Sequence, residues 1–161
     1  MNRIDIQIEE FEVEEWVNRR GWAAVIYIDR KPVAEFLKQF EPSICSSPQS
    51  RSPYGRWIGI SPVDVLPPSR SFLGTPDEKF SDFAGRVPVC ACSECGMYWC
   101  DGIWTRVLVS ETKIVWTDFI ANPEINPVRL DAVPRLEFDP QQYRDAFSVI
   151  PNAEQDVPPY T

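Results

Sequence analysis

The residues most suited to chemistry are four cysteines that lie close together in the second half of the chain. They are Cys90, Cys92, Cys95 and Cys100. Four thiolates can hold a structural zinc ion, but such sites usually pair two Cys-x-x-Cys turns across a longer insert, and this segment has only one. We keep the four cysteines as metal candidates, yet expect no stoichiometric metal, no cofactor, and no disulfide among them in a reducing compartment.

The sequence gives little support for catalysis by histidine or by a reactive cysteine. The chain has no histidine, which removes His-based triads, HExxH zinc sites and imidazole bases. Redox chemistry at Cys92 and Cys95 would need a helix N-terminus to lower a thiol pKa, whereas the residues that follow lead into a strand-like run. A cysteine nucleophile would have only Arg86 and Arg106 as nearby activating cations.

Two further kinds of catalytic motif are carboxylate pairs and glycine-rich loops that bind phosphate. Glu14 with Glu15, or Asp118 with Glu137, could in principle exchange protons with a substrate. Spacing alone neither brings two carboxylates together nor raises a pKa, so solvated surface is the favoured interpretation. The glycine patterns that cradle phosphates are absent from the sequence.

Negative charge is concentrated at the start of the chain. The 24 acidic and 16 basic residues give a formal charge of −8, and five of those net charges fall in the first fifteen residues. Such a field steers basic partners and repels nucleic acids and anionic membranes. The residues expected to contact a basic protein are the following: Glu9, Glu10, Glu12, Glu14, Glu15 and Trp16. The alternative is a solvated strand edge whose charges prevent aggregation.

Periodicity predicts the elements that must position these residues. Apolar residues alternate over 3–13, as in an edge strand, and recur with helical spacing over 33–40. The remaining predicted elements are strands at 22–28, 86–92, 103–109 and 113–119, and a helix at 140–149. The last helix carries its own start signals, with Asp139 as N-cap, Pro140 at its first position, and Gln142 placed for a capping box.

These elements predict a single α+β domain over residues 1–150, in which an antiparallel meander is flanked by two short helices. Half of the sixteen prolines fall in a long Pro- and Ser-rich loop region at 41–88, whose aromatic and aliphatic residues we expect to pack on the core. Residues 151–161 are predicted to be a disordered tail. No signal peptide or membrane-spanning run is evident, so a cytoplasmic location is expected.

Several segments together resemble a known group of sequences. They are Ile28–Leu37, Tyr54–Gly59, Arg70–Gly74, Cys90–Gly96, Val115–Phe119 and Phe138–Tyr143. From about Tyr27 to Phe147 the chain resembles a family of small uncharacterised bacterial proteins, in which a CxCGExGC-like element precedes a VxWxDF-like strand. Here Ser93 replaces the usual glycine and Met97 the usual third cysteine. The resemblance implies a bacterial origin and a shared fold, and it brings no activity with it.

Small size, acidity and the missing catalytic signatures favour a binding protein over an enzyme. We expect an acidic partner-binding protein, of the kind that serves as an inhibitor or immunity protein against a basic toxin or nuclease. Two alternatives stay open. One is a small metal-dependent or thiol enzyme built on Cys90–Cys100, and the other is a structural module.

Overall fold

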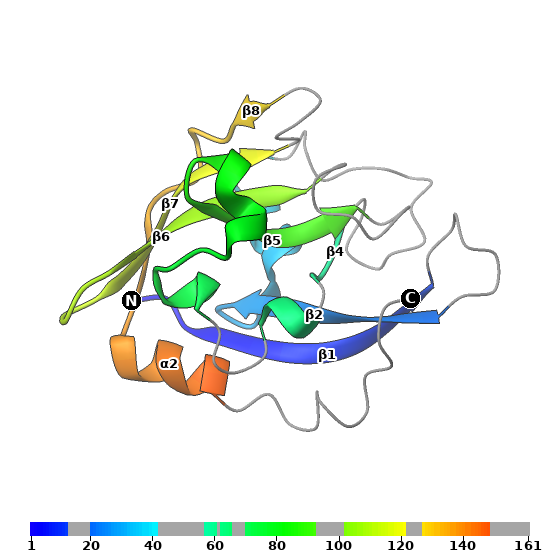
Figure 1. The fold of residues 1–161 in the computed structure, drawn as a ribbon, viewed down its shortest axis with the longest axis horizontal. Coiled ribbons are helices and arrows are strands. Elements are labelled where there is room, and N and C mark those ends of the chain that lie inside the picture. The colour runs from blue at the N-terminus through cyan, green and yellow to red at the C-terminus, as the bar shows by residue number, and fades with distance from the viewer. Residues whose placement is uncertain are drawn as a thin grey trace.

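Two antiparallel sheets and two helices make up the α+β fold of the computed structural model (Figure 1). It describes residues 1–12, 20–41, 57–60, 62–65, 70–92, 102–121 and 127–148. The strands are β1 (Ile4–Glu12), β2 (Arg20–Ile28), β3 (Lys31–Pro32), β4 (Trp57–Ile58), β5 (Arg86–Cys92), β6 (Ile103–Val109), β7 (Ile114–Ala121), β8 (Val128–Arg129) and β9 (Leu136–Phe138). The helices are α1 (Val33–Lys38) and α2 (Pro140–Ser148).

The smaller sheet has the order β1-β2-β3, and β1 forms one of its edges, as the alternating pattern predicted. Ile4, Ile6 and Ile8 lie opposite Ile28, Ile26 and Ala24. Because side chains alternate between the faces of a strand, these six residues share one face, and that face packs into the main core. Asp29 and Arg30 both have positive φ, which suits the two-residue turn between β2 and β3.

The larger sheet runs in the order β4-β5-β6-β7-β8, and β9 pairs with the other half of β7. The predicted meander of three strands is therefore confirmed, with β6 in its centre. Trp104 on β6 and Trp116 on β7 are fully buried. Each anchors an aromatic cluster: Phe83 stacks on Trp104 at 4.0 Å between ring centroids, and Phe138 lies edge-on to Trp116 at 5.3 Å.

The two sheets are joined by backbone hydrogen bonds at one isolated bridge. Ile60, just after β4, exchanges two backbone hydrogen bonds with Ala24 of β2, of 2.8 and 3.0 Å. Gly59 comes so close to β2 that a β-carbon on it would lie 2.2 Å from the carbonyl oxygen of Ala24. The two sheets can therefore meet here only at a glycine, and they enclose one hydrophobic core.

Helix α2 begins as predicted at Asp139, whose Oδ1 accepts a 2.9 Å hydrogen bond from the backbone N–H of Gln142. The predicted capping box is wrong. The Gln142 side chain turns instead to β1, where it bonds the backbone of Ile4. Tyr143 and Phe147 are the buried residues of this helix. Helix α1 is shorter than predicted, ending at Lys38 before a turn that includes Phe40.

The described parts of 41–88 consist of β4, the first residues of β5 and short 3₁₀ helices at Pro62–Asp64, Ser71–Leu73 and Glu78–Phe83. Buried apolar side chains fix them to the core: Ile60, Val65, Phe72 and Phe80. The expected packing of this Pro-rich region is thus confirmed where it is described. The predicted tail at 151–161 lies outside the described residues. No helix in the described ranges is long and apolar enough to cross a membrane.

Candidate docking edge

Among the described residues, no strand lies beside the outer edge of β1. Ala24 points its N–H and C=O away from β1, toward Ile60. In an antiparallel ladder both members of such a pair point outward, so its partner Ile8 directs its own groups away from β2. Ile6 lies two residues earlier on β1, so its N–H and C=O also point away from β2. No described strand pairs with this side of β1.

Within the described part of the chain, a side chain covers the beginning of this edge. The amide of Gln142 donates from Nε2 to the carbonyl oxygen of Ile4 at 2.6 Å and accepts at Oε1 from the Ile4 N–H at 3.1 Å. It thus satisfies both groups, as the backbone of a neighbouring strand would. The edge beyond Ile4 opens beside the rest of α2.

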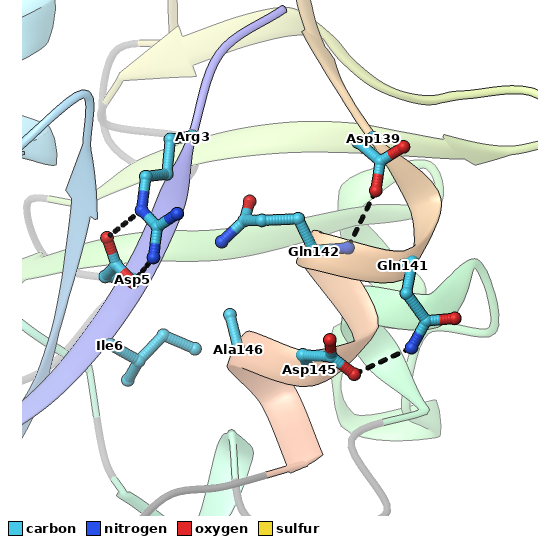
Figure 2. Close-up of a pocket in the computed structure, with 8 residues that line it drawn as sticks. All are labelled: Arg3, Asp5, Ile6, Asp139, Gln141, Gln142, Asp145 and Ala146. Carbon is cyan, nitrogen blue, oxygen red and sulfur yellow. Dashed lines mark hydrogen bonds and ion pairs between the residues drawn. The ribbon is translucent and has the colours of Figure 1, made fainter.

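A groove of about 600 Å³ lies between β1 and α2 (Figure 2). Its walls are formed from β1 by Arg3, Asp5 and Ile6, and from α2 and its cap by Asp139, Gln141, Gln142, Asp145 and Ala146. Figure 2 shows the Ile6 side chain extending from β1 toward α2, whereas the side chains of Gln141 and Asp145 lie on the side of α2 away from β1. Polar and charged residues outnumber the two apolar ones, Ile6 and Ala146, in the lining of the groove.

Acidic groups predominate in this groove. Arg3 is the one cation among the described residues of its lining, and it pairs with Asp5 at 3.1 Å between Nε and Oδ2. On the helix side Asp145 accepts a 2.8 Å hydrogen bond from Gln141. The carboxylate of Asp139 caps the helix. Two carboxylates of the groove therefore have no cationic partner among the described residues, which leaves its field negative.

The predicted acidic contact residues are partly placed by the structure. Glu9 lies on β1 and accepts a 2.7 Å hydrogen bond from the hydroxyl of Tyr27. Glu10 is exposed on the same strand. The backbone of Glu12 ends β1, and nothing is described of its side chain. Glu14, Glu15 and Trp16 lie outside the described residues, so their contact with a partner stays a prediction.

Of the four candidate metal-binding cysteines, the structure describes the side chain of Cys90 alone. Cys90 on β5 is 1% exposed and packs in the main core, which removes its thiol from solvent. Only the backbone of Cys92 is described, and Cys95 and Cys100 lie outside the described residues. Within the described ranges, no three cysteine, aspartate or glutamate side chains gather as metal ligands would.

The carboxylate pair considered for acid–base chemistry is divided between different cations. Lys113 binds Glu137 at 2.7 Å, whereas Asp118 is surrounded by arginines. The hydrogen bond from Lys113, together with its charge, lowers the pKa of Glu137, which is the opposite of what a general acid needs.

Sequence reasoning missed the groove residues Asp5, Asp139 and Asp145. Asp139 was identified as a helix cap, but no local pattern shows that β1 and α2 lie side by side. The available signal was the edge character of the first strand, which implies open backbone groups. No protein-family model, no curated protein and no solved structure matches the chain.

Proposed function

We propose that this protein binds a basic, extended segment of a partner protein, which adds as a strand to the open edge of β1. The observation that carries the proposal is the outward-facing backbone of Ile6 and Ile8 beside an acid-lined groove. Strand addition of this kind obtains affinity from main-chain hydrogen bonds and specificity from side-chain pockets.

Charge supports a basic occupant. Carboxylates lie on both sides of the edge, at Asp5 and Glu9 on one face of β1 and at Asp145 on the helix. A lysine or arginine at alternate positions of an added strand would meet them. The chain's own C-terminal residues are a poor match, because Glu154 and Asp156 repeat the sign of the groove.

An inhibitor or immunity protein acting on a basic toxin or nuclease fits this binding mode. Such a protein needs rapid association, which complementary charge provides, and no catalytic group of its own. The acidic N-terminal residues at Glu10, Glu12 and Glu14 would extend the same field beyond the groove.

An eight-residue peptide that alternates lysine and valine provides a direct test, with its glutamate–valine counterpart as control. We expect the lysine peptide to bind, to weaken with added salt, and to slow amide exchange at Ile6 and Ile8 in hydrogen-exchange NMR. Failure of the lysine peptide to protect these amides at low salt would refute strand addition at this edge.

Two substitutions at one position separate backbone pairing from packing. Ile8→Pro removes the outward N–H without touching the hydrogen bonds to β2, and Ile8→Ala removes the same packing but keeps the N–H. We expect binding to be lost in the folded proline variant and retained in the alanine variant. Equal binding by both would show that the backbone edge is not used.

The charge contribution is tested at Asp145 and Glu10. The double variant Asp145→Lys, Glu10→Lys should slow association with the lysine peptide and flatten its salt dependence, with little change in melting temperature. Unchanged association kinetics would confine these carboxylates to a structural or solubilising role.

A further inference from the structure

Away from the β1 groove, three arginines gather around one carboxylate on the larger sheet. Arg86 of β5 lies directly opposite Arg106 of β6 in the strand register. Asp118 of β7 and Arg129 of β8 complete the group. Like charges directly opposite one another across a sheet are destabilising, so this placement needs an explanation.

Asp118 sits at the centre of the arginine cluster. Its Oδ2 is 3.3 Å from Nε of Arg106 and 3.9 Å from Nη2 of Arg86, and its Oδ1 is 3.8 Å from Nη2 of Arg129. Only the shortest of these is a hydrogen bond. One carboxylate therefore balances part of the charge of three guanidinium groups.

The backbone at Asp118 is also unusual. Its φ is +57°, a left-handed conformation that lies within a strand, next to an irregularity in the pairing of β6 with β7. This conformation is uncommon for residues other than glycine, and it tends to occur where function requires a particular geometry. Here the carbonyl oxygen of Asp118 accepts a 2.9 Å hydrogen bond from Nε of Arg86 and so fixes that arginine in place.

The three arginines carry more hydrogen-bond donors than the described residues around them accept. Arg129 uses its Nε for a 3.3 Å bond to Asp131. The terminal Nη groups of Arg86, Arg106 and Arg129 donate no hydrogen bond within the described part of the chain. Burial, and after it repulsion from Arg106, lowers the pKa of Arg86, while Asp118 acts in the opposite direction.

We propose that Arg86, Arg106 and Arg129 bind a phosphate group, either free phosphate or the phosphate of a phosphomonoester. Guanidinium groups suit this ligand because they donate paired hydrogen bonds to its oxygens. Partial exposure leaves a path for the ligand, since the side chain of Arg106 is 34% exposed and that of Arg129 is 71% exposed. Asp118 prearranges the arginines and competes with the incoming anion.

That competition gives a sharp test. Asp118→Asn removes the competing charge, and asparagine tolerates the left-handed conformation, so the backbone contact to Arg86 is retained. We expect this variant to bind inorganic phosphate about tenfold more tightly than the unmodified protein, measured by calorimetry at constant ionic strength. Arg129→Gln, at an exposed position, should weaken binding about tenfold.

Arg144→Gln, on the exposed face of α2, is the matched control and should leave phosphate binding unchanged. Inorganic phosphate and O-phosphoserine, titrated separately, distinguish a free anion from a phosphomonoester as the preferred ligand. Phosphate should also shift the Nε–Hε NMR signals of Arg106 and Arg129. Absence of saturable binding in Asp118→Asn, or equal affinity in Asp118→Asn and Arg129→Gln, would overturn the proposal.

Discussion

The hydroxyl group of Tyr143 links three distant parts of the chain. It accepts a 2.9 Å hydrogen bond from Nε1 of Trp116 and donates a 2.8 Å bond to the carbonyl oxygen of Phe72. All three residues are buried. Burial raises the pKa of Tyr143, so the hydroxyl keeps its proton and remains a donor.

Tyr143→Phe should consequently lower the free energy of unfolding by about 2–3 kcal/mol, because it leaves a buried N–H and a buried C=O without a partner. Urea denaturation followed by far-ultraviolet circular dichroism measures this. Tyr27→Phe is the control, since its hydroxyl bonds Glu9 in a partly buried setting, and it should cost less than about 1 kcal/mol. Equal losses would contradict the role assigned to the buried pair.

At the scale of elements, the side chain of Gln142 joins α2 to β1 by two hydrogen bonds. Gln142→Ala removes both bonds to Ile4 and exposes its backbone groups, so we expect a loss of about 1–2 kcal/mol in the free energy of unfolding. Gln141→Ala removes an exposed contact to Asp145 and should change stability by less than about 0.5 kcal/mol. Hydrogen exchange should also quicken at Ile4 in the first variant alone.

Lys113, the residue before β7, forms an ion pair with Glu137 of β9, and the contribution of this pair to stability depends on pH. Lys113 holds the pKa of Glu137 below its usual 4.5. A depressed carboxyl pKa stabilises the folded state above the unfolded value, and that stabilisation disappears as the pH falls through the folded value. Glu137→Gln should therefore lower the urea midpoint at about pH 7, and this effect should shrink as the pH falls through the lowered folded pKa of Glu137. Lys113→Gln should reproduce this pH dependence, and a difference that persists in acid would contradict it.

At the scale of the whole molecule, the two sheets meet where Gly59 approaches Ala24, and we expect this point to be sensitive to substitution. Gly59→Ala would force a methyl group against the backbone of Ala24. Because backbone atoms cannot move aside without breaking the bonds between Ala24 and Ile60, we expect a loss of about 3 kcal/mol. Gly85→Ala meets only a side-chain atom at 3.5 Å, at a φ of +76°, and should cost about 1 kcal/mol. A smaller loss in Gly59→Ala than in Gly85→Ala would show that the joint is not essential.

Local patterns predicted much of this architecture, and long-range pairing accounts for the rest. The alternation of Ile4, Ile6 and Ile8 indicated an edge strand, and Asp139 marked the start of α2. Neither pattern reveals that Gln142 binds Ile4, since the two are 138 residues apart. The division into two sheets depends in the same way on the approach of Gly59 to Ala24. The sequence therefore shows two features of the candidate docking edge, its acidic residues and its alternating pattern, but it does not show the groove beside the edge.

The bond between Gln142 and Ile4 also has a consequence for synthesis. On the ribosome the first strand emerges long before Gln142, whose side chain bonds the backbone of Ile4, because the two residues are 138 positions apart. Contacts of such separation slow folding, and an uncovered strand edge is prone to pair with other chains. Glu9 and Glu10, near the end of this strand, would help to keep nascent copies apart during this interval.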